Sequence, residues 1–192
     1  KYKFPISGIF PSMLNEKIID KAYEYLEKAA VKMNYKIGPI KADYIVKNQE
    51  LTLLEISTRF HGDVLTSNTN FYYSNQNPIN FYIDFFLNKK KKPKIEKKKN
   101  YGVMWHSIFF KKPRKKLILS DLSKKLKSLN KKYKILDLYI RNTKIVGHKD
   151  NTSINGFLWI KVNRNKNSVK VLYKKIRLLL GKFVITWLIW EN

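Results

Sequence analysis

The chain has 192 residues, of which 44% are hydrophobic and 14% aromatic; this is enough for one or two small domains with real cores and excludes a disordered chain. It contains no cysteine, which excludes disulfides and thiol catalysis, and its three histidines lack the spacing of a metal-ligand set. The formal net charge of +26 favours binding to polyanions such as nucleic acids. However, lysine is scattered from end to end, arginine is scarce, and A/T-rich codons account for the excess of lysine. We therefore predict no specific nucleic-acid partner.

The N-terminal third begins with a strand and a helix. Residues 1–10 combine apolar side chains with Pro5 and Gly8, which is typical of an edge strand and loop. Asn15 is a good N-cap, and apolar residues then recur at helical spacing as far as Met33, which predicts a helix with one face packed in the core. We interpret the beginning of the chain as the middle of a domain, so we expect a fragment of a longer protein.

A β-hairpin is predicted over residues 38–63, with its turn centred near Gln49. This turn places Asp43 of the first strand directly opposite Glu55 of the second, about 5 Å apart at Cβ. Two carboxylates at that distance repel each other unless a cation lies between them. Mg²⁺ takes one or two carboxylates together with phosphate oxygens and water, so the hairpin predicts a site for magnesium bound to phosphate.

Further polar residues surround these two acids. By alternation along the second strand, the residues expected on the face of Glu55 are Leu51, Leu53, Ser57 and Arg59. An arginine there suits a phosphate that is bound to the metal. Lys41 is expected on the other face from Asp43, in solvent. His61 either contacts a substrate or supports the strand, and we leave both open.

These residues resemble the ATP-grasp superfamily. The matching residues are Gly38-Pro39, Asp43, Glu55-Ile56-Ser57-Thr58-Arg59 and His61-Gly62, preceded by the helix of residues 15–35. Family members typically carry an acid on one strand and Glu-x-Asn-x-Arg on the next. The resemblance implies that Asp43, Glu55 and Ser57 hold Mg²⁺ against the phosphates of ATP, with Ser57 standing where Asn is usual. It also implies that Arg59 is catalytic and steadies the γ-phosphate or an acyl phosphate.

The resemblance implies an ATP- and Mg²⁺-dependent ligase that joins a small-molecule carboxylate to an amine through an acyl-phosphate intermediate. The fragment would lack the family's glycine-rich loop and its adenine-contacting lysine. Two alternatives remain open: a catalytically degenerate ATP-grasp binding module, suggested by Ser57, and a basic nucleic-acid-binding protein. We expect a cytoplasmic protein, because the chain has no cysteine. We expect no membrane partner, because the apolar residues 176–190 are interrupted by charges and a glycine.

The rest of the chain is predicted to be α+β. Residues 65–77 are a loop or short helix, residues 78–87 a helix whose aromatic side lies in the core, and residues 89–100 a lysine-rich linker. A separate unit, residues 101–192, has strands predicted at 101–109, 135–145, 156–162 and 183–190 and helices at 120–129 and 168–180. With the resemblance to the ATP-grasp superfamily, these elements imply the C-terminal half of an ATP-grasp domain (residues 1–88), an antiparallel sheet with helices, followed by a small α+β sandwich.

Overall fold

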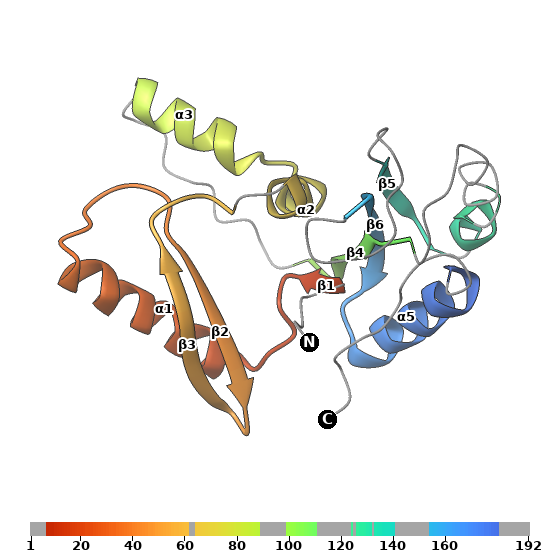
Figure 1. Cartoon of the computed structure of the whole chain (residues 1–192), viewed down its shortest axis with the longest axis horizontal. Coiled ribbons are helices and arrows are strands. Elements are labelled where there is room, and N and C mark those ends of the chain that lie inside the picture. The colour runs from red at the N-terminus through yellow and green to blue at the C-terminus, as the bar shows by residue number, and fades with distance from the viewer. Residues whose placement is uncertain are drawn as a thin grey trace. The chain divides into compact units, whose positions relative to one another are not determined.

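The computed structural model describes residues 7–61, 64–88, 99–110, 124, 126–131, 133–140 and 154–180 (Figure 1). The chain is α+β, with helices beside antiparallel sheets, as predicted. Contacts divide it into two compact units, Ser12–Thr66 and Lys1–Pro11 with Ser67–Asn192. The domain limits drawn from the sequence at residues 88 and 100 stay a prediction, and most of the predicted linker lies outside the described residues.

The unit Ser12–Thr66 is a helix packed on a hairpin. Its elements are α1 (Glu16–Lys32), β2 (Lys41–Lys47) and β3 (Glu50–Ser57). The predicted N-cap is confirmed, because the side chain of Asn15 accepts a hydrogen bond of 2.9 Å from the backbone N–H of Lys17. The hydroxyl of Tyr44 donates to the carbonyl oxygen of Ala22 at 2.9 Å, so one face of the hairpin lies against α1.

The hairpin has a two-residue turn and one bulge. Asn48 and Gln49 have φ values of 50° and 65°, the left-handed pair that a tight type I′ turn requires. From this turn the ladder pairs residues regularly as far as Tyr44 with Leu53, and then the register shifts so that Asp43 pairs with Glu55. Leu54 is therefore the extra residue of a β-bulge.

The bulge confirms one prediction and overturns another. Asp43 lies directly opposite Glu55, as predicted. Leu53 pairs with Tyr44, and its neighbour Leu51 pairs with Val46, so both leucines lie on the face that meets α1. The prediction that Leu51 and Leu53 share the face of Glu55 was wrong, because the bulge at Leu54 interrupts the simple alternation.

In the described residues, the other unit is built on a four-stranded antiparallel sheet. In space its order is β1 (Ser7–Phe10), β4 (Tyr101–Ile108), β6 (Gly156–Asn163) and β5 (Ile135–Ile140). β1 is an edge strand, as predicted, and it pairs with β4 far along the chain. The strand predicted at residues 183–190 lies outside the described residues.

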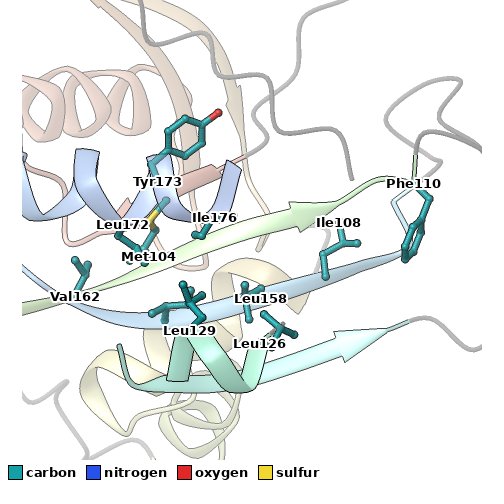
Figure 2. Packing of buried hydrophobic residues seen from close by; sticks show 11 residues of the cluster. Met104, Ile108, Phe110, Leu126, Leu129, Leu158, Val162, Leu172, Tyr173 and Ile176 are labelled. Atoms are coloured by element: carbon teal, nitrogen blue, oxygen red, sulfur yellow. The ribbon is translucent and has the colours of Figure 1, made fainter. Parts of the chain in front are cut away.

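One face of this sheet carries the apolar core (Figure 2). Helix α5 (Lys166–Leu180) and the helical residues 126–130 cover it. The buried side chains of the cluster are Met104, Ile108, Phe110, Leu126, Leu129, Leu158, Ile160, Val162, Leu172, Tyr173 and Ile176. The predicted start of α5 at Ser168 was late, because Asn165 caps the helix by accepting from the backbone N–H of Ser168 at 2.7 Å.

Helix α2 (Val64–Ser74) is held on the other face of the sheet from Ser67 onward. The indole N–H of Trp159 donates to Thr69 Oγ1 at 2.9 Å in a buried contact, and Tyr72 donates a hydrogen bond to Asp137. The rings of Tyr72 and Trp159 lie 5.6 Å apart between centroids. The segment predicted to be a loop or short helix is thus a helix, and hydrogen bonds anchor its C-terminal half.

Helix α3 (Pro78–Asn88) forms where it was predicted, but its apolar side is not in the core. Large side chains on it remain 41–76% exposed, namely Ile79, Ile83, Phe86 and Leu87. Periodicity identifies the residues that share a helix face but does not identify a partner for that face. None of the helices in the described residues is long and apolar enough to cross a membrane.

Candidate ligand-binding site on the hairpin

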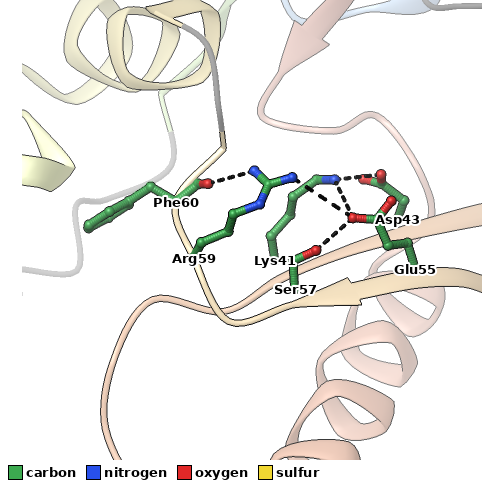
Figure 3. A network of polar contacts seen from close by, with 6 residues as sticks. All are labelled: Lys41, Asp43, Glu55, Ser57, Arg59 and Phe60. Carbon is green, nitrogen blue, oxygen red and sulfur yellow. Dashed lines mark hydrogen bonds and ion pairs between the residues drawn. The ribbon is translucent and has the colours of Figure 1, made fainter.

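Five polar residues gather at the end of the hairpin away from its turn (Figure 3). We call Lys41, Asp43, Glu55, Ser57 and Arg59 the hairpin cluster. Two cross-strand pairs that are two positions apart, and so on one face, build it: Lys41 with Ser57 and Asp43 with Glu55. Arg59 follows just after β3. Paired residues share a face, so the backbone alone brings the first four side chains together.

The ammonium of Lys41 lies between the two acids. Its Nζ is 2.7 Å from Asp43 Oδ2 and 3.6 Å from Glu55 Oε1. The prediction that Lys41 lies on the opposite face in solvent was wrong, because residues two apart on a strand share a face. The side chain of Lys41 is 16% exposed, whereas those of Asp43 and Glu55 are 48% and 52% exposed. The spacing Lys-x-Asp was the signal in the sequence that could have revealed this lysine.

Glu55 is the centre of the polar contacts. The hydroxyl of Ser57 donates to Glu55 Oε1 at 2.6 Å. This hydrogen bond, followed by the positive charges of Lys41 and Arg59, lowers the pKa of the Glu55 carboxyl. Glu55 is therefore ionised at neutral pH and presents a full negative charge.

Arg59 is held loosely beside the acids. Its Nη1 donates to the carbonyl oxygen of Phe60 at 3.0 Å, and its Nη2 lies 4.0 Å from Glu55 Oε1. The side chain is 56% exposed, and an ion pair of this kind contributes little to stability. The guanidinium is thus placed next to the carboxylates and remains accessible to an anionic ligand.

The donor set fits a magnesium ion that arrives with phosphate. Two carboxylates already converge on one cation, the ammonium of Lys41, and both are half exposed. In the part of the chain that the structure describes, no group of three or more His, Cys, Asp or Glu residues could hold a metal. Two carboxylates suit Mg²⁺, which usually keeps water and takes substrate phosphates as further ligands. Ser57 as a metal ligand stays a prediction, since its hydroxyl donates to Glu55.

Neither of the two described histidines is one of the five residues of the hairpin cluster. His61 follows it by two residues and is exposed, and its role stays open. His106 is buried in β4, in the other unit, and His148 lies outside the described residues. The sequence therefore identified four of the five clustered residues and missed Lys41.

The fold is shared with one part of several solved structures of ligases and synthetases. Solved structures that share it match the chain almost from end to end, so the predicted resemblance is confirmed at the level of the fold. No protein-family profile matches the sequence, and no curated protein matches it. The structural likeness is therefore the finding that connects this chain to known proteins.

Three of these structures illustrate the likeness. L-amino acid ligase from Bacillus licheniformis is 13% identical with a TM-score of 0.68, and the match covers 100% of this chain and 45% of that one. N5-carboxyaminoimidazole ribonucleotide synthetase from Thermus thermophilus is 15% identical with a TM-score of 0.58, covering 97% and 44%. Phosphoribosylglycinamide synthetase from Anaerococcus prevotii is 14% identical with a TM-score of 0.55, covering 94% and 45%. The chain thus spans less than half the length of each of these proteins.

Proposed function

We propose that the chain supplies the metal- and phosphate-binding strands of an ATP- and Mg²⁺-dependent ligase that joins a carboxylate to an amine. One observation carries the proposal: Asp43 and Glu55 lie opposite each other and converge on a single cation position. The fold supports it, because the proteins that share this fold include an amino acid ligase and two synthetases.

Each residue of the hairpin cluster has a role in this proposal. Asp43 and Glu55 hold Mg²⁺, which when bound neutralises charge on the phosphates of ATP. Ser57 donates a hydrogen bond to Glu55, which lowers the pKa of this carboxyl and favours the ionised form that acts as a ligand. Arg59 contacts the transferring phosphoryl group and stabilises the charge that develops on it.

The proposed reaction has two steps. A carboxylate oxygen of the substrate attacks the γ-phosphorus of ATP, and the bond from that phosphorus to the bridging oxygen breaks to release ADP. The amine then attacks the acyl carbon of the resulting acyl phosphate, inorganic phosphate leaves, and the amine loses a proton. The chain contributes positioning and electrostatic stabilisation to the first step. This chemistry is compatible with the cytoplasmic location that is expected from the sequence.

Phosphate release by the full-length protein tests the proposal. With ATP, Mg²⁺ and pools of small carboxylates and amines, we expect ATP-dependent release of phosphate that Glu55→Gln abolishes. Glu50→Gln is the matched control, because Glu50 begins the same strand but pairs with Lys47 beside the turn. Unchanged release in Glu55→Gln would contradict the proposed site.

Binding measurements separate the proposal from its alternatives. A noncatalytic ATP-grasp module would bind Mg·ATP with a dependence on Glu55 and release no phosphate with any substrate pool. A nucleic-acid-binding protein would bind duplex or single strands with a steep salt dependence and would be indifferent to Glu55→Gln. Each outcome is distinct from the one expected for a ligase.

A further inference from the structure

Lys41 occupies the position that the proposed function gives to a metal ion. Its Nζ is within 2.7 Å of Asp43 and 3.6 Å of Glu55, and its side chain is the least exposed of the three (Figure 3). A lysine that merely covered the surface would extend its ammonium into solvent. Here the ammonium is directed inward, between two carboxylates that are themselves half exposed.

The charges of the hairpin cluster cancel. Two carboxylates face one ammonium and one guanidinium, so a free divalent cation that enters gains little net attraction. A metal–nucleotide complex is different, because its phosphates bring negative charge. Those phosphates can accept hydrogen bonds from Lys41 and Arg59 while the metal takes the carboxylates.

We propose, building on the proposed function, that Lys41 is a resident counter-cation that keeps the metal position filled until a metal–nucleotide complex displaces it. The flexible four-carbon stem of lysine lets the ammonium move from the carboxylates to a phosphate without movement of the strands. The site then rejects free Mg²⁺ and accepts it only together with phosphate. Lys41 is thus a specificity-determining residue.

Binding of Mn²⁺ tests this role without any turnover. Mn²⁺ shares the oxygen ligands and octahedral preference of Mg²⁺, and the paramagnetic resonance signal of the free ion is lost when it binds. The full-length protein and its variants are titrated with Mn²⁺ alone and then with Mn²⁺ and ADP. The ratio of the two Mn²⁺ affinities measures how strongly the nucleotide favours metal binding.

Three variants give the expected pattern. Lys41→Met should bind Mn²⁺ alone at least about tenfold more tightly than the wild type, because a positive charge beside the metal is gone. Lys41→Arg should resemble the wild type, since it keeps the charge. Lys47→Met is the matched control; it removes the same charge from an exposed position beside the turn and should leave Mn²⁺ affinity unchanged. Thermal melting establishes that all variants are folded.

The outcomes distinguish this inference from the proposed function. If Lys41→Met binds Mn²⁺ alone no better than Lys47→Met, the role of Lys41 is overturned. If Lys41→Met gains affinity for Mn²⁺ but no form of the protein binds Mn·ADP, the lysine acts as a counter-cation and the proposed function fails. If Lys41→Met gains affinity for Mn²⁺, and ADP strengthens Mn²⁺ binding much more in the wild type than in Lys41→Met, the role of Lys41 and the proposed function are both supported.

Discussion

Asp43 and Glu55 lie directly opposite each other across the β2–β3 ladder, and a single ammonium contacts both carboxylates. Side chains opposed in this way have Cβ atoms about 5 Å apart, so the strands themselves set the separation of the two acids. The charge of Lys41 removes the repulsion that two bare carboxylates would feel. Two carboxylates held this close can also share one Mg²⁺, which connects the local geometry of the hairpin to the proposed chemistry.

Ser57→Ala should raise the pKa of Glu55. The hydrogen bond from Ser57 is the largest cause of the lowered pKa of Glu55, and alanine removes it while leaving the charges of Lys41 and Arg59 in place. Carboxyl carbon resonances followed by NMR as a function of pH measure this directly. Glu50 on the same strand serves as the internal reference, and equal pKa values for Glu55 in both proteins would contradict the assigned cause.

Gln49→Gly should stabilise the hairpin by about 1 kcal/mol, because glycine adopts a left-handed conformation without the cost that other residues incur. Gln49 has a φ of 65° at the second position of the turn. Amide hydrogen exchange in β2 and β3 reports the gain as slower opening. A Gln76→Gly variant is the control, since Gln76 is not among the described residues with positive φ and should lose stability instead.

His106→Leu should remove an acid sensitivity of the fold. His106 is 1% exposed, neither ring nitrogen has a hydrogen-bond partner among the described residues, and its burial lowers its pKa to about 4. Between pH 6.5 and 4 the unfolded chain therefore binds a proton that the folded chain does not, so stability falls as the pH falls. The loss reaches on the order of 3 kcal/mol for a shift of this size.

Urea unfolding at pH 7.5 and at pH 5 measures this effect. Between pH 7.5 and pH 5 the free energy of unfolding should fall more in the wild type than in His106→Leu. Any fall that arises from other titratable groups is common to both proteins. The leucine variant should also be at least as stable as the wild type at pH 7.5, because it buries no unpaired ring nitrogen. Parallel losses in the two proteins would show that His106 is not the acid-sensitive group.

Gly156→Ala should destabilise the sheet by about 3 kcal/mol or more, because a Cβ there meets backbone that cannot move aside. An added Cβ would lie 2.1 Å from the carbonyl oxygen of Tyr139 on the neighbouring strand. Gly102→Ala is the comparison, since a Cβ there would lie 3.0 Å from the flexible side chain of Ile9 and 3.1 Å from the carbonyl oxygen of Phe10, a much milder contact. Urea unfolding should give a much lower free energy of unfolding for Gly156→Ala than for Gly102→Ala. Equal losses of stability in the two variants would contradict the clash.

Local signals predicted the elements well. Asn15 marks the beginning of α1, and alternating residues with a turn near Gln49 predict the hairpin and the pairing of Asp43 with Glu55. Such features depend on neighbours in sequence or across one ladder, so a single chain contains the necessary information. The likeness to ATP-grasp ligases followed from the same few residues.

Features that depend on packing were harder to predict. A bulge such as that at Leu54 breaks alternation without a distinctive residue type, so the faces of Leu51 and Leu53 were assigned wrongly. The apolar side of α3 has helical periodicity whether or not another element covers it. The error at Lys41 did not come from packing. Lys41 lies two residues before Asp43, so alternation along the strand already predicts that the two share a face, and the rule was not applied to it.

The bulge at Leu54 also gives the hairpin one residue of slack. From the turn to the acids, β3 is one residue longer than β2, and Leu54 absorbs the difference. A chain shortened by this leucine, or lengthened by one residue on β2, would have strands of equal length and would still set Asp43 against Glu55. The pairing of the two acids therefore tolerates a one-residue difference in strand length and does not depend on the identity of the side chain at position 54.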